Sequence, residues 1–192
     1  MSHMYKRMTL ALIALVAITG VSCSGELTDS AAPVELVVTN TQNLHRVDLD
    51  PNNGDADCEQ NVGTINLQAF PKNDSATGPF TSVRVTRYRV SYRRLDGGTL
   101  VPSSFVRPID TLIEVGGQGA GSNFLLMEAG AFARAPFAAL QPQNGGIDPE
   151  TGKSVITLEL IVEVWGETLG GDNVYDSTSF PLEFCYACGG CS

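Results

Sequence analysis

Four cysteines are the residues of this sequence that most clearly have the types and spacing to do chemistry. Cys185, Cys188 and Cys191 lie close to the end of the chain, and Cys58 lies far upstream. Four thiolates can hold zinc tetrahedrally, and Cys188 and Cys191, which enclose two glycines, also have the spacing of a redox pair. A c-type haem is excluded because Ser192 follows Cys191 where the attachment motif requires histidine.

Structural disulfides are the interpretation that we favour for these four cysteines. In an exported protein an even set of cysteines usually oxidises rather than binding metal. Four cysteines permit three pairings, and the sequence alone does not choose among them. The three C-terminal cysteines are too close together for every neighbouring pair to bridge comfortably, which favours one bond to Cys58. Such a bond would close a long loop, and the chain-entropy model values that closure at about 4 to 5 kcal/mol.

A second group of possible ligands lies between Asp48 and Asp57. Oxygen-bearing side chains recur there as they do in a calcium loop; they are Asp48, Asp50, Asn52, Asp55 and Asp57. However, Gly54 comes one residue late for an EF-hand, and no helix-forming sequence flanks the segment. A solvated loop rich in aspartate and asparagine needs no ion, and we favour it.

Half of the basic residues that follow position 22 are arginines in one expected strand; they are Arg84, Arg87, Arg89, Arg93 and Arg94. Such a stripe would suit an anionic glycan, a phosphate or another partner, with Arg87, Arg89 and Arg93 as the contacts. We favour instead cross-strand ion pairs with acids such as Glu159 and Glu163, each worth about 0.2 to 1 kcal/mol.

The only tryptophan, Trp165, falls on the opposite parity from the core residues of its expected strand. It is therefore a further possible contact for a partner protein or a sugar. Packing at the end of a hairpin is the alternative, and we favour it.

Catalytic residues are scarce in this sequence. Outside the N-terminal segment, His45 is the only histidine, and no nucleophile motif, zinc-protease motif or phosphate loop is present. His45 near Asp48 would need a nucleophile to act with, and we expect a plain loop histidine. Glu159 and Glu163 share one strand face, as two acids of a hydrolase would, but acids on a solvated sheet face are common. We expect a protein that is not an enzyme and has no cofactor.

The first 22 residues have the layout of a secretory signal peptide. Lys6 and Arg7 supply the positive end, and Thr9–Ile18 is an apolar stretch too short to span a bilayer comfortably. Gly20 and Ser22 supply the small residues of a cleavage region.

The segment Gly20-Val21-Ser22-Cys23-Ser24 resembles the lipobox of bacterial lipoproteins. The resemblance implies cleavage before Cys23, acylation of that residue and anchoring of the chain to a membrane through its N-terminal lipid. Ser24 implies sorting to the outer membrane. The family usually carries a larger apolar residue in the place of Gly20. The alternative is plain secretion, with a cut near Ser22 that leaves Cys23 as an unpaired thiol.

Charge and composition exclude several classes of protein. The chain of 192 residues is 43% hydrophobic with 20 Gly and 10 Pro, which excludes disorder, coiled coils and collagen. Removal of residues 1–22 takes away two basic residues and no acid, so the net charge of −9 becomes −11. Such a chain is repelled by nucleic acid, and we expect no nucleic-acid partner.

Hydrophobic alternation predicts strands along residues 33–192, which we take as one domain behind a tether at residues 23–32. Ser154–Trp165 places five apolar residues on one face and is the expected core strand. Thr81–Arg94 changes parity near Thr86, which predicts a bulge or a break.

The same pattern predicts shorter strands at Pro33–Thr39 and Val62–Phe70, and a return strand at Val174–Phe184. Gly116–Ser122 is expected to be a flexible loop, and Ala129–Leu140 is the only segment that favours a helix, of about two turns. Thr99–Val106 is expected to continue outward from the Asp96-Gly97-Gly98 turn.

Eight or nine short strands with glycine and asparagine turns indicate an all-β, antiparallel β-sandwich with long loops and a cysteine-rich tail. The stretch Tyr88–Arg93, followed by Asp96-Gly97-Gly98, resembles the middle hairpin of fibronectin type III and immunoglobulin-like modules. The sequence therefore predicts a lipid-anchored structural or binding module of the bacterial cell envelope, with a protein or glycan partner. A soluble secreted domain that binds carbohydrate or metal is the alternative, and an envelope hydrolase is the least favoured.

Overall fold

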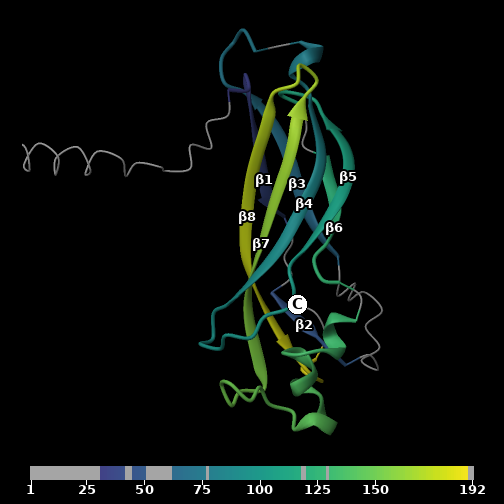
Figure 1. Cartoon of the computed structure of the whole chain (residues 1–192), viewed down its shortest axis with the longest axis vertical. Helices are drawn as coiled ribbons and strands as arrows, with labels where there is room; N and C mark the ends of the chain where they lie inside the picture. Colours follow the sequence, from purple (N-terminus) through teal and green to yellow (C-terminus); the bar gives the residue numbers. More distant parts are fainter. Residues whose placement is uncertain are drawn as a thin grey trace, which may run out of the picture.

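Two mainly antiparallel sheets pack against each other around one hydrophobic core (Figure 1). The computed structural model describes residues 31–41, 45–50, 62–76, 78–117, 120–128 and 130–189. The smaller sheet has the strand order β1-β3-β6 and the larger has the order β2-β8-β7-β4-β5. Their bounds are β1 Val34–Asn40, β2 Arg46–Asp48, β3 Val62–Pro71, β4 Val83–Arg94, β5 Phe105–Ile113, β6 Ala120–Leu125, β7 Val155–Thr168 and β8 Asn173–Cys185.

The central strand of the larger sheet is β7, which pairs along its whole length with β8 and over most of it with β4. Its inward residues are completely buried; they are Ile156, Leu158, Leu160, Val162 and Val164. The expected core strand is therefore confirmed, and it runs three residues beyond Trp165. The glycine turn that follows it returns the chain into β8, as the sequence predicted.

The predicted bulge in β4 is confirmed. The register of β4 against both β5 and β7 shifts between Val85 and Arg87. The extra residue, Thr86, lets Val85 face the core before it and Tyr88 face the core after it, although the two differ in parity.

The smaller sheet contains the main error of the sequence-based prediction. Gly116–Ser122 was expected to be a loop, but its last three residues begin strand β6, which pairs antiparallel with β3. The glycines suggested flexibility, whereas the partner strand supplies the missing order by its backbone hydrogen bonds. Gly121 lies opposite Asn66, so pairing rather than side-chain packing holds this edge.

Two further segments differ from expectation. Arg46–Asp48 forms the short strand β2, parallel to the end of β8; the sequence predicted no strand there, and the expected aspartate-rich loop overlaps β2 only at Asp48. Thr99 does not continue a strand, because β5 begins only at Phe105, after a loop. Strand β2 depends on a partner distant in sequence, whereas β5 pairs with β4, the strand before it.

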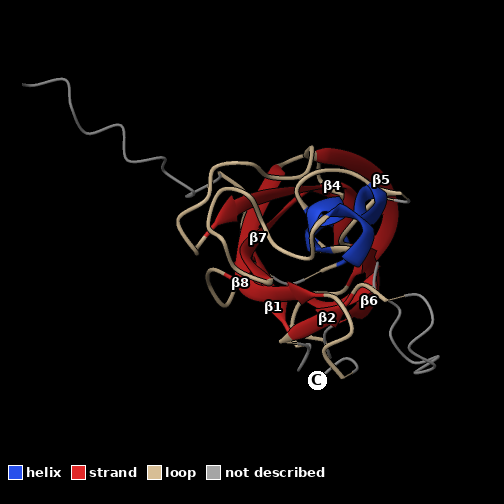
Figure 2. Cartoon of the chain, turned by 90° about the horizontal axis from the view of Figure 1, so that it is seen from below, coloured by secondary structure: helices blue, strands red, loops and turns tan. Residues whose placement is uncertain are grey.

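Short 3-10 turns take the place of the expected helix in the long connection between β6 and β7. They are η2 (Ala131–Ala133), η3 (Phe137–Leu140) and η4 (Pro142–Asn144), and η1 (Pro79–Thr81) precedes β4. Seen along the long axis, strands of both sheets surround a common interior, and helical turns lie over one end of it (Figure 2). Phe137 seals that end, because its ring lies 4.6 Å from the ring of Phe184 and is completely buried.

Side-chain and backbone contacts join the two sheets at their margins. The Val38 N–H of β1 donates to the carboxylate of Asp176 on β8, at 2.7 Å. On the other margin, Gly116 N–H donates to the carbonyl of Ala69 at 2.9 Å, beside a parallel bridge from Ala69 to Val115. The two sheets are thus joined by hydrogen bonds at both margins as well as by packing in the core.

Candidate functional site

The outer face of the larger sheet brings together four of the residues that the sequence marked as possible contacts. The register places Arg87 of β4 opposite Trp165 of β7, and Trp165 opposite Tyr175 of β8. Arg89 and Arg93 follow on the same face of β4. We call the surface formed by Arg87, Arg89, Trp165 and Tyr175 the Arg87 face.

Aromatic stacking and cation–π contacts organise the Arg87 face. The rings of Trp165 and Tyr175 lie 5.3 Å apart. The guanidinium carbons of Arg87 and Arg89 lie 5.3 and 5.7 Å from the centre of the Trp165 ring. The tryptophan is half-buried beneath these groups, so it packs within the sheet face rather than at the end of a hairpin.

Ion pairs neutralise two of the three marked arginines. Arg89 forms two hydrogen bonds with Glu163, which raise the pKa of Arg89 above its usual value, and the Tyr175 hydroxyl donates to the same carboxylate at 3.2 Å. Arg93 pairs with Glu159. These two expected ion pairs are confirmed.

Arg87 differs from its neighbours. Within the part of the chain that the structure describes, no carboxylate forms an ion pair with Arg87, and its side chain is exposed. Its cross-strand position is filled by Trp165, where Arg89 and Arg93 meet glutamates. The apolar Val106 and Pro108 of the edge strand β5 lie beside Arg89 and Arg87. The Arg87 face therefore exposes one guanidinium group that has no carboxylate partner among the described residues. This group lies over the Trp165 ring and is bordered by apolar residues of β5.

Two of the three C-terminal cysteines are oxidised. Cys185 and Cys188 form a disulfide, with their Cα atoms 6.0 Å apart. This bond uses two of the four thiolates that the zinc alternative required, and it joins Cys188 to Cys185 rather than to Cys191. Cys58 and Cys191 lie outside the described residues, as does Cys23, the predicted site of lipidation.

Asp48, the first residue of the possible calcium loop, binds the tail instead. Its buried carboxylate accepts hydrogen bonds from the backbone N–H groups of Ala187, Cys188 and Gly189 at 2.9 to 3.2 Å. Asp50 accepts a hydrogen bond from the Tyr186 hydroxyl at 3.3 Å.

The other three members of the possible calcium loop, Asn52, Asp55 and Asp57, lie outside the described residues, so this calcium site stays a prediction. Among the residues that are described, no three histidine, cysteine or acidic side chains are grouped as a metal site requires.

A buried charge cluster was missed by the sequence analysis. Arg94 does not belong to the exposed stripe, because its side chain is only 2% exposed and binds Asp96 and Asp148, which are 4% and 1% exposed. Arg94 has the same parity as Tyr88 and Tyr92, which face the core, and this was the signal that could have placed it inside.

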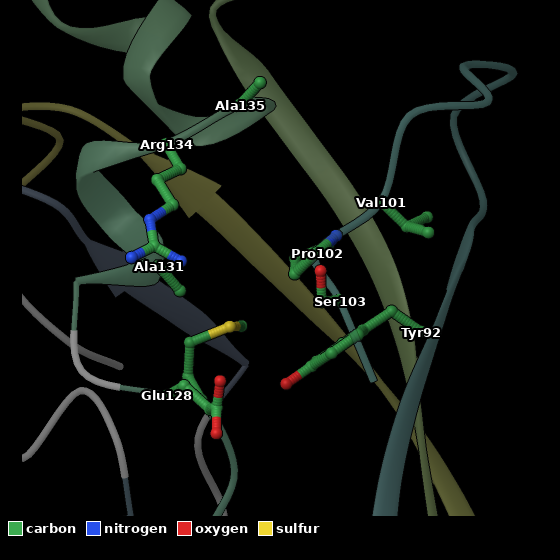
Figure 3. A pocket seen from close by; sticks show the side chains of 9 residues that line it. Tyr92, Val101, Pro102, Ser103, Glu128, Ala131, Arg134 and Ala135 are labelled. Atoms are coloured by element: carbon green, nitrogen blue, oxygen red, sulfur yellow. The ribbon is translucent and has the colours of Figure 1, made fainter. Parts of the chain in front are cut away.

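A pocket of about 80 Å³ lies near this cluster, between the β4–β5 loop and η2 (Figure 3). Tyr92 and Met127 belong to its inner wall, and Val101, Pro102 and Ser103 form one side. Glu128, Ala131, Arg134 and Ala135 form the other side. The Tyr92 hydroxyl donates to the carbonyl of Leu126 at 2.7 Å, and burial raises the pKa of Tyr92, so it stays neutral.

Catalytic groups do not assemble around His45 in the described structure. His45 is exposed and its backbone carbonyl accepts a hydrogen bond from Glu183 N–H. Glu159 and Glu163 are both engaged, by Arg93 and Ser179 and by Arg89 and Tyr175 respectively.

In comparisons with protein-family models, curated proteins and solved structures, nothing matches this chain. No helix among the described residues has the length and apolarity to cross a bilayer. The geometry of the chain itself therefore carries the functional argument.

Proposed function

We propose that this protein is an exported, lipid-anchored module of a bacterial cell envelope that binds an acidic protein partner through the Arg87 face and catalyses no reaction. The observation that carries the proposal is the exposed guanidinium of Arg87, held over Trp165 without a carboxylate partner among the described residues. An arginine held on an aromatic ring loses less side-chain freedom when it binds, and its planar fork suits a carboxylate.

A protein partner fits this face better than a sugar. A sugar would need a free aromatic surface on which to stack, but two guanidinium groups and Tyr175 already contact Trp165. The exposed Val106 on the neighbouring edge strand adds apolar area of the kind that protein partners cover. Because removal of residues 1–22 changes the net charge from −9 to −11, attraction to an acidic partner must act at short range, within a screening length of about 8 Å.

The fold that we propose for this module is immunoglobulin-like. An immunoglobulin domain keeps strands A, B and E in one sheet and C, F and G in the other. If β1, β3 and β6 are taken as A, B and E, then β4, β7 and β8 fall in the places of C, F and G. The long connection between β6 and β7 is the main departure from that plan.

The anchor in this proposal is an acylated Cys23. The basis is the sequence pattern that precedes it, a positive end, an apolar stretch and small residues. An oxidised Cys185–Cys188 pair is in keeping with an oxidising compartment. Replacing Cys23 by alanine should move the protein from the membrane fraction to the soluble fraction and reduce the intact mass by its acyl groups. Unchanged membrane partitioning would remove the anchor from the proposal but leave the binding face.

The binding proposal is tested with a glutamate-rich peptide, with a glutamine-rich peptide of equal length as the neutral control. Quenching or enhancement of the single tryptophan reports binding directly, because Trp165 lies within the face. Arg87→Gln should weaken binding of the acidic peptide by about tenfold or more, since a charge-assisted hydrogen bond contributes about 1.5 to 3 kcal/mol.

Arg84→Gln is the matched control. Arg84 is an exposed arginine of the same strand, but Asp110 already binds it through two hydrogen bonds at 2.8 and 2.9 Å. Trp165→Glu is the complementary variant, because it would place a carboxylate opposite Arg87 and should abolish peptide binding while the fold is retained. This variant contains no tryptophan, so its peptide binding is measured by titration calorimetry, with the wild type measured in the same way. Equal binding by wild type and by Arg87→Gln would refute the proposal. Stronger binding of a uronic-acid oligosaccharide than of the peptide would replace the protein partner by a glycan.

A further inference from the structure

The pocket between the β4–β5 loop and η2 carries two opposite charges that do not neutralise each other. Arg134 and Glu128 both line the pocket, and they form no ion pair with each other in the described part of the chain. Figure 3 shows their side chains, with the hydroxyls of Tyr92 and Ser103, directed around one space. Arg134 has no other carboxylate partner among the described residues, so its guanidinium is available to a ligand.

Glu128 is only lightly committed elsewhere. One of its oxygens lies 3.8 Å from the Arg107 guanidinium, and both side chains are 47% exposed. A contact of that length is a weak ion pair at a solvated surface. The second oxygen of Glu128 can therefore accept hydrogen bonds from an ammonium group in the pocket.

The walls of the pocket are held in place before any ligand binds. Glu150 accepts hydrogen bonds from Thr99 N–H and Leu100 N–H at 2.9 and 2.8 Å, and the buried Arg94 donates to the Leu100 carbonyl at 3.2 Å. These bonds fix the loop just before Val101. On the other wall, Arg134 N–H donates to the carbonyl of Ala131 at 3.0 Å. Fixed walls reduce the entropy lost when a small ligand binds.

The size and lining of the pocket limit the ligand. A volume of about 80 Å³ is roughly half that of a cavity that holds benzene, so only a few heavy atoms fit below the mouth. The lining is mixed: Met127, Val101 and Pro102 contribute apolar groups, and Tyr92, Ser103, Glu128 and Arg134 contribute polar groups. Such a lining accepts a short carbon skeleton whose charged groups reach the two sides.

We propose that this pocket binds a small zwitterion, a free α-amino acid with a short side chain. Arg134 binds the carboxylate through its planar fork, Glu128 binds the ammonium group, and the skeleton lies against Met127. A simple carboxylate would leave Glu128 unmatched beside it, and a simple amine would leave Arg134 unmatched, so each binds more weakly than a molecule that carries both charges. The site is separate from the Arg87 face and stands whether or not that face binds a partner.

The test is a titration of the isotope-labelled protein, at pH 7, with glycine, L-alanine, acetate and methylammonium as separate probes. Backbone amide shifts of Ala131 and Ser103 report on the pocket. Glycine and L-alanine should bind at least about tenfold more tightly than acetate or methylammonium, because each single-charge probe loses one charge-assisted contact. L-Leucine, which has three more carbon atoms than L-alanine to fit into about 80 Å³, should bind more weakly than L-alanine.

Two variants assign the charges. Arg134→Gln and Glu128→Gln should each weaken glycine binding by about tenfold or more. Arg84→Gln, a solvent-exposed change of the same type on β4, should leave it unchanged. Ala131→Leu, which fills the pocket but keeps both charges, should also abolish binding and guards against a charge variant that fails to fold.

The outcomes separate this site from the Arg87 face. Arg87→Gln should bind glycine as the wild type does, and Arg134→Gln should keep its affinity for the acidic peptide. Absence of binding by every probe overturns the proposal. Acetate that binds as tightly as glycine overturns the role of Glu128, and glycine binding that survives Arg134→Gln overturns the assignment of the carboxylate.

Discussion

Replacing Arg94 by methionine should destabilise the fold by several kcal/mol, because it leaves two buried carboxylates without their cation. The Arg94 side chain is 2% exposed and donates to both oxygens of Asp96, at 2.7 and 2.9 Å, and to Asp148 at 2.7 Å. It also donates to the Leu100 carbonyl. Methionine fills much of the same space but supplies none of these hydrogen bonds.

The magnitude follows from the burial of the pair. Removing one partner of a buried ion pair costs about 3 to 5 kcal/mol, because the other charge stays buried without compensation. Arg84→Met is the matched control, since Arg84 makes the same two-bond contact with Asp110 while the two side chains are 53% and 70% exposed. An exposed pair contributes about 0 to 1 kcal/mol. Both variants therefore lose a two-bond contact between arginine and aspartate, one buried and one exposed, and Arg94→Met also loses the bonds to Asp148 and Leu100.

The deficit of Arg94→Met should also depend on pH. Burial raises the pKa of Asp96, but hydrogen bonds from Arg94, Thr157 N–H and Gly98 N–H outweigh this effect and hold the pKa at about 2. A folded-state pKa below the unfolded value of 3.8 stabilises the fold at neutral pH, by about 2 kcal/mol, and this stability is lost as the pH falls through 2. Roughly 1 kcal/mol of it should be gone by pH 3.

In the variant, the pKa of Asp96 rises, so protonation relieves the buried charge and the deficit relative to wild type shrinks on acidification. Urea unfolding at pH 7, 5 and 3, followed through the fluorescence of Trp165, measures the difference. The reasoning fails if Arg94→Met loses no more stability than Arg84→Met at pH 7, or if the deficit of Arg94→Met is the same at pH 7 and pH 3.

Three further changes test other parts of the fold. Cys188→Ser should lower the free energy of unfolding by about 2 kcal/mol in chemical denaturation, because the disulfide closes only a very short loop; no change would mean that the bond does not form. Asp48→Ala should remove hydrogen-exchange protection from the amides of Ala187–Gly189, which donate to its carboxylate, and unaltered protection would contradict that contact. Deletion of Thr86 should keep the protein folded, because it restores regular alternation in β4. Deletion of Ser91 should abolish soluble expression, because it would turn Arg93 toward the core. Equal thermal stability of the two deletion variants would show that the bulge does not set the register.

Alternation in the sequence predicted β4 and β7 of the larger sheet well because one face of each of these strands is buried. From Ile156 to Val164 in β7, every second residue is apolar and completely buried, so the local pattern and the tertiary structure agree. The bulge at Thr86 was predictable for the same reason, because two apolar sets of opposite parity in one strand require an extra residue between them. A change of parity is thus as informative as the alternation itself.

Elements that depend on distant partners were not predictable from local patterns. Strand β6 carries a glycine and little apolar alternation, and it is ordered by its pairing with β3. Strand β2 spans only three residues and pairs with the end of β8, which comes far later in the chain. Such short edges gain their order from a neighbour, which a window of adjacent residues does not contain.

The candidate sites show the same division. Arg87 and Trp165 were marked by composition and parity, but their contact depends on the register between β4 and β7. The pocket draws residues from the β4–β5 loop, from the start of the β6–β7 connection and from η2, and no motif links them. Asp148 is buried by an arginine that lies 54 positions before it. The sequence thus marked individual side chains as possible contacts, and the strand topology determined which of them lie next to each other.

The cross-strand partners of the outward arginines of β4 show how Arg87 differs from the others. Opposite the outward arginines of β4, strand β7 places Glu167 before the bulge, and Glu163 and Glu159 after it. The one position in this series that lacks an acid is Trp165, opposite Arg87. A glutamate at that position would complete the series and neutralise Arg87, at no cost to the core, because the residue points outward. Trp165 instead packs against Tyr175 and under both arginines, and in the proposed function it keeps Arg87 oriented without a carboxylate opposite it.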